Sequence, residues 1–249
     1  MKDSKTSNRT PIPILTYHQI ADAPPKGAPY RSLYVSPGDF SRQMAFLAKL
    51  GYRGLSMSDL QPYLRGACSG KVVGITFDDG YLNNLTHALP VLREYGFSST
   101  CYVVSGLLGK TNVWDLGLGI AQVPLMTASQ LQQWVAGGQE VGAHTRSHVH
   151  LSAVSEEQGL AEIAHSQLDL EAHDGLRARH FCYPYGDFDS NTLRLVAGAG
   201  FETATTTRRS RCIAGDSFLE LPRVPVLRST TRLLLWLKLA TRYEDRRRV

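Results

Sequence analysis

The fold of this chain is indicated most directly by residues 71–80, which read KVVGITFDDG. The first seven residues, Lys71 to Phe77, are rich in β-branched and apolar side chains, as expected for a buried strand. Two carboxylates and a glycine follow at once. A buried strand that ends in charged residues is typical of a parallel sheet, in which polar side chains are delivered to the floor of a cleft.

Similar strand patterns recur along the chain, each separated from the next by a helical pattern. They are predicted at Ile12 to Tyr17, Ser99 to Val104, Glu140 to Ala143, His180 to Tyr183, Phe201 to Ala204 and Leu221 to Val226. Six or seven alternations with short connections predict an α/β fold, a distorted (β/α) barrel of about seven parallel strands in a single domain. A doubly wound open sheet is the alternative, but no GxGxxG follows a strand.

Helical patterns fill the intervals. Leu82 to Tyr95 has leucines on one side, Thr127 and Gln130 form a capping box, and a last helix is predicted from Ser229 to about Tyr243. We therefore expect residues 1–10 to be a flexible polar tail and residues 11–228 to form the barrel. Residues 229–249 are expected to form a basic amphipathic C-terminal helix.

The composition excludes several classes of protein. The 249 residues are 43% hydrophobic, with 27 basic and 22 acidic side chains. Because the basic residues are not interleaved with aromatic ones in a patch, no nucleic-acid binding is expected. The four cysteines form no CxxC pair, which argues against a zinc ribbon or a redox motif. The N-terminus has no signal-peptide pattern and no run is long enough to span a bilayer, so we expect a cytoplasmic protein.

The ionisable residues fall at the carboxyl ends of predicted strands. Asp78 and Asp79 follow one strand, His144 and His148 another, and His18 follows the first. Parallel barrels assemble their active sites at this rim. An aspartate pair alone is more often a turn, and a histidine pair alone is more often incidental. Together, two imidazoles and a carboxylate are the minimum set for a catalytic zinc or iron site.

The spacing of the two histidines, four residues apart, would place both rings on one side of a helical turn. The two tryptophans Trp114 and Trp134 are interpreted as core or loop packing rather than as parts of a site. Tyr183 and Tyr185 could equally pack or bind a sugar ring.

Three motifs resemble those of the carbohydrate esterase family 4 polysaccharide deacetylases. They are TFDDG at residues 76–80, HTRSH at 144–148 and YPYG at 183–186. In addition, LTYH at 15–18 and LPRVPV at 221–226 are similar to a branch of the family that includes poly-N-acetylglucosamine deacetylases. The resemblance covers roughly Ile12 to Val226.

The resemblance implies a metal site and a reaction. Asp79, His144 and His148 would hold one divalent metal, Zn²⁺ in the first place, with Co²⁺, Ni²⁺ or Fe²⁺ as alternatives. The metal would acidify a water molecule and polarise the acetamide carbonyl, while Asp78 would act as general base. The backbone N–H of Tyr185 would help to hold the oxyanion. The implied partner is an N-acetylated glycan, polymeric, oligomeric or lipid-linked.

The sequence departs from the family pattern at two points. No Leu-x-His motif follows Gly186 to supply the general acid, so His18 is the candidate, because the first and last strands of a closed barrel are neighbours. A buried core histidine is the alternative interpretation of His18. The family's arginine before motif three is Cys182 here, and Arg179 and Arg223 are the two candidates to orient Asp78, with Arg223 included in the predicted site.

Competing functions stay open at the level of sequence. One is an amide hydrolase of the same fold that acts on a cyclic imide or ureide. Another is a carbohydrate-binding module that has lost catalysis. A third is a non-haem iron oxygenase, although such enzymes usually have an all-β jelly roll.

The C-terminal helix raises a separate question, because residues 233–237 read LLLWL between arginines. This run is too short to span a bilayer. It is expected either to cover the barrel or to rest on a membrane surface, with Trp236 at the interface. The second alternative would place the protein at the inner face of the membrane. The oligomeric state is left open.

Overall fold

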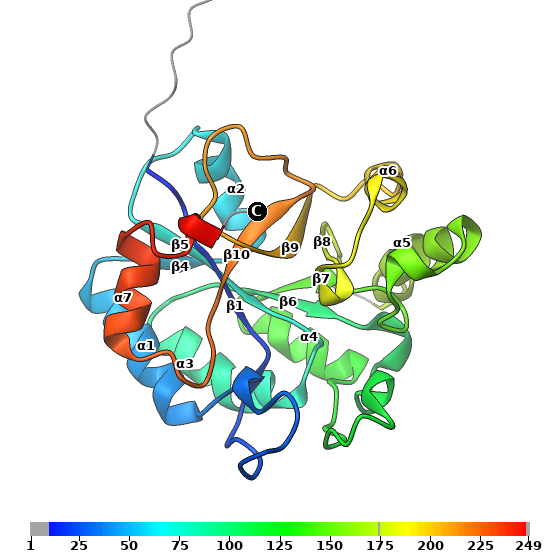
Figure 1. Cartoon of the computed structure of the whole chain (residues 1–249), viewed down its shortest axis with the longest axis horizontal. Coiled ribbons are helices and arrows are strands. Elements are labelled where there is room, and N and C mark those ends of the chain that lie inside the picture. Colours follow the sequence, from blue (N-terminus) through cyan, green and yellow to red (C-terminus); the bar gives the residue numbers. More distant parts are fainter. Residues whose placement is uncertain (1–9, 174, 248–249) are drawn as a thin grey trace, which may run out of the picture.

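Seven parallel strands form a closed ring in the computed structural model, which describes residues 10–173 and 175–247 (Figure 1). They are β1 (Ile14–Tyr17), β5 (Val72–Phe77), β6 (Thr100–Val103), β7 (Glu140–Ala143), β8 (His180–Cys182), β9 (Thr203–Arg209) and β10 (Leu221–Pro225). The ring closes because β1 pairs with both β5 and β10. The predicted single-domain barrel of seven parallel strands is confirmed. The tail expected at residues 1–10 lies, except for Thr10, outside the described residues.

Three short strands lie outside the ring. β4 (Arg53–Leu55) pairs with the first half of β5, whereas β6 pairs with its second half. The strands β2 (Gln19–Ile20) and β3 (Tyr34–Val35) form a separate parallel pair. This pair follows directly after β1 and lies at the end of the barrel where the strands terminate.

Helices surround the ring. They are α1 (Pro37–Lys49), α2 (Met57–Arg65), α3 (Leu89–Glu94), α4 (Ala128–Ala136), α5 (Glu156–Glu171), α6 (Ser190–Gly198) and α7 (Arg232–Ala240). The predicted capping box is present at α4, where Thr127 accepts a hydrogen bond from the Gln130 N–H and the Gln130 side chain returns one. None of the helices in the described part of the chain is long and apolar enough to span a bilayer.

Alternate residues of each strand face opposite sides, as strand geometry requires. On β5, Val73, Ile75 and Phe77 belong to the core layer between the ring and the helices. Val72 belongs instead to a second cluster that fills the barrel together with Met57 and residues from other strands. The outward-facing strand residues therefore pack against the helices. The inward-facing residues fill the interior of the barrel and, at one end, form the site.

The amino-terminal end of the barrel is closed by α2. The N–H of Met57 donates to Thr100 Oγ1 and the N–H of Ser58 donates to Glu140, so the start of α2 is bonded to the first residues of β6 and β7. His180 joins the same cluster, with its Nε2 3.5 Å from the Glu140 carboxylate and 3.0 Å from the Ser58 hydroxyl. The cavity that contains the ionisable residues of the strand ends lies at the carboxyl end of the barrel.

Two predicted helices differ from those observed. The segment expected as a helix over residues 82–95 is helical from residue 82 to 94, but its middle is a π-helix, Asn84–Ala88, directly before α3. Pro90 accounts for the wider turn, because it has no N–H to donate to the preceding turn. The helix expected from Ser229 to about Tyr243 is only Arg232–Ala240. It stops because Thr241 is extended, and the chain then turns back toward the barrel.

Candidate active site

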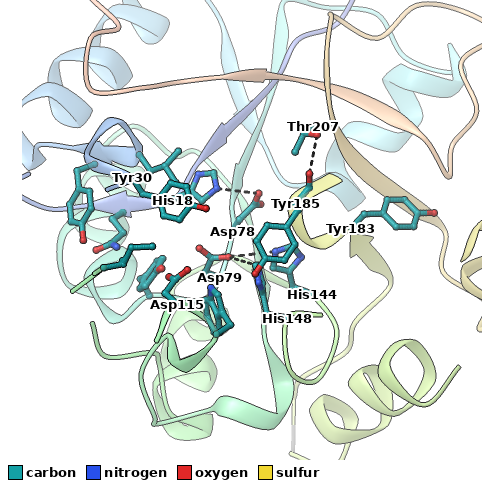
Figure 2. A pocket seen from close by; sticks show the side chains of 16 residues that line it. His18, Tyr30, Asp78, Asp79, Asp115, His144, His148, Tyr183, Tyr185 and Thr207 are labelled. Atoms are coloured by element: carbon teal, nitrogen blue, oxygen red, sulfur yellow. Dashed lines mark hydrogen bonds and ion pairs between the residues drawn. The ribbon is translucent and has the colours of Figure 1, made fainter. Parts of the chain in front are cut away.

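A cavity of about 140 Å³ lies at the carboxyl ends of the strands (Figure 2). It is lined by His18, Gln19, Tyr30, Leu33, Tyr34, Asp78, Asp79, Tyr81, Trp114, Asp115, Ile120, His144, His148, Tyr183, Tyr185 and Thr207. The residues singled out at the strand ends thus meet in one place, as the parallel topology requires. Arg223 does not line the cavity but lies directly behind it.

Asp79, His144 and His148 form a compact cluster on the cavity floor. One ligand atom from each lies within 4.8 Å of the others. The Nε2 atoms of His144 and His148 lie 3.5 and 3.4 Å from the same carboxylate oxygen, Oδ1 of Asp79. Burial would raise the pKa of Asp79, but hydrogen bonds with the two imidazoles hold that pKa well below its usual value. The cluster therefore offers an ionised carboxylate and two imidazole nitrogens to one point.

The two histidines do not lie on a helical turn, so that prediction is wrong. They belong to a loop in which Thr145 and His148 both have φ of 62°. Thr145 Oγ1 accepts a hydrogen bond of 2.9 Å from the N–H of His148 and fixes this bend. Asp79 is also left-handed, with φ of 76°. Such conformations cost energy and are found where a site needs a defined geometry.

The orientation of His144 is fixed from behind. Its Nδ1 lies 2.7 Å from the carbonyl oxygen of Cys182 and donates to it, which leaves Nε2 facing Asp79. His148 is held by stacking on Trp114, with ring centroids 4.5 Å apart. This donor set, two imidazole nitrogens and one carboxylate with a cavity above, fits a zinc-type divalent ion with open coordination positions.

Asp78 is bound by a bidentate salt bridge. The two terminal nitrogens of Arg223 donate to its two oxygens at 2.6 and 2.7 Å. Both side chains are buried. Burial would raise the pKa of Asp78, but the Arg223 guanidinium outweighs it and holds the pKa below its usual value. Asp78 is therefore a carboxylate at neutral pH.

Of the two arginine candidates, the structure brings only Arg223 to Asp78. Arg223 is on β10, and its guanidinium also donates to the Thr206 carbonyl and lies 3.2 Å from Cys182 Sγ. Arg179 instead lies at the surface, 3.9 Å from Glu202. Cys182 leaves room inside the barrel, and the arginine from β10 fills it.

His18 lies at the mouth of the cavity. Its Nε2 is 3.9 Å from Asp78 Oδ2, and its side chain is 25% exposed. It is therefore not a fully buried core histidine. In Figure 2 its ring lies on the opposite side of Asp78 from Tyr185, facing the same space. Its role as the acid remains a prediction.

Tyr185 forms the other side of the cavity. Its backbone is left-handed, with φ of 60°, and its ring stacks on His150 at 3.9 Å between centroids. Its ring edge also contacts His148. A Cβ at the next residue, Gly186, would lie 1.9 Å from Thr207 Oγ1 on a backbone with φ of 70°, so any larger residue would be strained and would displace Thr207. The role of the Tyr185 N–H toward an oxyanion also remains a prediction.

Several cavity residues were missed by sequence reasoning. Trp114 and Asp115 lie in the long loop after β6, in a short 3-10 helix, Val113–Asp115. The interpretation of Trp114 as packing alone is wrong, whereas Trp134 does lie in the core. Asp115 is buried, its carboxylate accepts a hydrogen bond from Asn112, and burial raises its pKa. The sequence indicates this part of the cavity only by a tryptophan next to an aspartate, in a loop that has no helical periodicity.

A parallel barrel with a carboxylate pair and two histidines at its open end defines a class of hydrolytic active sites. The sequence profile of the polysaccharide deacetylase family matches residues 65–204, more than half of the chain. The protein belongs to the polysaccharide deacetylase family. The predicted resemblance to the carbohydrate esterase family 4 enzymes is confirmed, and the oxygenase and the non-catalytic module are set aside.

Individual relatives agree with this assignment. The chain is 27% identical over 224 residues to YxkH of Bacillus subtilis (strain 168), covering 89% of this chain and 74% of the relative. It is 22% identical over 199 residues to a poly-beta-1,6-N-acetyl-D-glucosamine N-deacetylase of Staphylococcus aureus (strain MRSA252), covering 76% and 67%. The structure of Streptococcus pyogenes deacetylase PplD in complex with acetate superposes with a TM-score of 0.80 at 25% identity, covering 93% and 99%.

Proposed function

We propose that this protein is a metal-dependent deacetylase of N-acetylglucosamine-containing oligo- or polysaccharides. The observation that carries the proposal is the pairing, in one cavity, of an ionised Asp78 with the cluster of Asp79, His144 and His148. The named activity of the Staphylococcus aureus relative supports the sugar, and acetate bound to PplD fits the product.

The donor set determines what the cluster would hold. Asp79, His144 and His148 would bind one divalent ion, and Zn²⁺ suits two imidazoles and a carboxylate. Such an ion supplies Lewis acidity toward a carbonyl oxygen and makes water more acidic. Asp79 contributes a single negative charge, so a divalent ion bound here would keep a net positive charge with which to polarise the carbonyl.

Asp78 is placed to act as the general base. Arg223 occupies one lone pair on each carboxylate oxygen, Thr16 Oγ1 donates to Oδ2 at 3.4 Å, and Oδ1 keeps a further lone pair. Asp78 therefore accepts a proton from water while its orientation stays fixed. The hydroxyl adds to the acetyl carbon, and acetate and the sugar amine are the products once the C–N bond breaks. The amine needs a proton at that moment, and in this proposal His18, whose Nε2 lies 3.9 Å from Asp78 Oδ2, supplies it.

The walls of the cavity suit a sugar ring. Tyr185 and Trp114 present aromatic surface on either side of His148. Asp115 points into the same space in Figure 2 and offers a carboxylate to sugar hydroxyls. Aromatic faces with a few polar groups are typical of small-ligand pockets.

Acetate release from N-acetylglucosamine oligomers tests the proposal. The wild-type protein is stripped with chelator, refilled with Zn²⁺ or Co²⁺, and assayed on β-1,6- and β-1,4-linked oligomers. Activity should require the metal. Asp78→Asn should keep the metal and lose about 10²–10⁴-fold in rate, which is the usual contribution of a general base. If the refilled wild type releases no acetate from either linkage, or if Asp78→Asn is as active as wild type, the proposal is wrong.

A further inference from the structure

One face of α7 is apolar and exposed. Leu233, Trp236, Leu237 and Ala240 lie at i, i+3, i+4 and i+7, so they form one stripe along the helix. Leu233 is 68% exposed and Trp236 is 40% exposed. Figure 1 shows α7 at the outside of the barrel beside α1. Leu233 is largely uncovered, whereas Trp236 packs in part against the barrel and lines a depression with Pro11 and Lys71.

The opposite face of α7 is anchored in the protein. Leu235 and Leu239 are buried in the main core. Lys238 is buried and donates both to the Pro225 carbonyl and to Glu244. The helix therefore cannot rotate to hide its exposed stripe, because that would expose two leucines and break a buried ion pair.

In the sequence, the net positive charge of the chain is carried by its last 24 residues. Residues 226–249 contain seven basic and two acidic side chains, a surplus of five, which equals the surplus of the whole chain. Both acids are paired with described residues, Glu244 with Arg209 and Lys238, and Asp245 with Arg211. Arg232 and Arg246 are exposed and have no salt bridge within the described part of the chain.

We propose that the exposed stripe of α7 docks on the surface of an anionic lipid bilayer. Leucine and tryptophan side chains enter the interface between headgroups and acyl chains, while arginines at the ends of the helix meet the phosphates. The charge argues against a second copy of this chain as the occupant, because a symmetric contact would bring the same arginines together. It is the membrane that complements both the apolar stripe and the basic flanks.

The position of α7 relative to the cavity is consistent with this docking. The segment before α7 is bonded to the cavity rim, where the N–H of Arg228 donates to the Ser32 carbonyl at 2.9 Å. Ser32 lies in the 3-10 helix Arg31–Leu33, and Leu33 lines the cavity. The first turn of α7 therefore follows the cavity rim, whereas Trp236 and Ala240 lie toward the amino-terminal end of the barrel. The stripe runs along the side of the barrel, and the inference does not depend on the reaction carried out in the cavity.

Co-sedimentation with vesicles tests the proposal on the full chain. Wild type should pellet with vesicles of equal phosphatidylglycerol and phosphatidylcholine, pellet much less with phosphatidylcholine alone, and be released by high salt. Leu233→Glu combined with Trp236→Glu should weaken partitioning at least tenfold. Arg232→Gln and Arg246→Gln should each weaken it about fivefold.

A matched control is available on α5. Leu160→Glu combined with Leu168→Glu changes two exposed leucines, 47% and 60% exposed, to the same residue with the same change in net charge. This variant should pellet like wild type. If the Trp236 substitution disturbs folding, as thermal unfolding would reveal, Leu233→Glu alone serves in its place.

Two results would overturn the proposal. One is that wild type fails to pellet with anionic vesicles at low salt. The other is that the α7 and α5 variants lose binding equally. If light scattering instead finds a wild-type dimer that Leu233→Glu converts to a monomer, without vesicle binding by either, the stripe is a contact between copies and the proposal is wrong.

Discussion

At the scale of single residues, the orientation of Asp78 depends on one guanidinium from β10, which is separated from β5 in the ring only by β1. Arg223 donates to both Asp78 oxygens, to Thr76 Oγ1 and to the Thr206 carbonyl. It has therefore no freedom to move with the substrate. A base fixed in this way acts from one direction only, which suits attack by a single water molecule.

The first prediction concerns this positioning role. Arg223→Lys keeps the charge but loses the planar pair of donors, so Asp78 should no longer be held by both oxygens. We expect kcat to fall at least tenfold while KM and bound metal change little. Metal analysis and steady-state kinetics on N-acetylglucosamine oligomers check this. A variant with wild-type kcat would show that the salt bridge serves stability alone.

The second prediction concerns His18 and the leaving group. His18→Ala should slow release of acetate from an N-acetylated sugar without loss of metal, because an amine needs a proton as it departs. It should also flatten the alkaline limb of the pH–rate profile. On 4-nitrophenyl acetate, whose leaving group needs no proton, the variant should match wild type. Equal losses on both substrates would return His18 to a structural role.

At the scale of elements, the strands and their polar ends were predictable from sequence because both are local patterns. Glu140–Ala143 was predicted with the observed bounds, and Asp78 and Asp79 follow directly from the end of β5. The contact between Arg223 and Asp78 was predicted only as one of two alternatives, because 145 residues separate the two side chains and no local pattern distinguishes Arg223 from Arg179. The bend at Thr145 was missed because a non-glycine residue with positive φ leaves no mark in hydrophobic periodicity.

The loop after β6 was missed for a similar reason. Trp114 and Asp115 enter the cavity because the loop folds back on itself, held by Asn112, whose side chain bonds to Asp115 and to the Val123 N–H. Such a loop has no period. An apolar residue in it has the same appearance in the sequence whether it packs in the core or lines a site.

The third prediction concerns the closed end of the barrel. Glu140 accepts hydrogen bonds from Ser58 and from Thr100 Oγ1 at 2.6 Å and lies beside His180. Burial would raise the pKa of Glu140, but His180 and the hydroxyls lower it to about 2. The stabilising contribution is therefore complete above about pH 4.5, the ordinary value, and is lost as the pH falls toward 2.

Urea unfolding of Glu140→Gln against pH measures this contribution. The free energy of unfolding should be lower in the variant by about 3 kcal/mol at pH 6, since one pKa unit corresponds to ~1.4 kcal/mol. The difference should shrink between pH 4.5 and pH 2. Glu171→Gln, at an exposed position on α5, is the control and should show no such dependence. A difference that is independent of pH would mean that the loss comes from packing rather than from ionisation.

At the scale of the whole molecule, the barrel and its last helix form one cooperative unit. Closure of the ring requires β10 to pair with β1, and α7 follows β10 and packs beside α1. The expected boundary at residue 228 therefore separates parts that share one core. The exposed stripe and the buried face of α7 are two sides of the same nine-residue helix. The helix can therefore pack on the barrel with one side and contact a membrane with the other, without moving.

The last prediction follows from this shared core. A chain that ends at Ser229 loses Leu235 and Leu239 from the core, each contributing about 1.5–3 kcal/mol. It also leaves the buried Arg211 without Asp245 and the Leu239 carbonyl, and an unpaired buried charge costs about 3–5 kcal/mol. Together these losses approach the stability of a whole domain, about 5–15 kcal/mol. The shortened chain should therefore lack the cooperative thermal transition of the full chain, whereas full-length Leu233→Glu should keep it. If the shortened chain instead melts within a few degrees of the full chain, α7 is an appendage, and the buried pair of Arg211 and Asp245 contributes little to the fold.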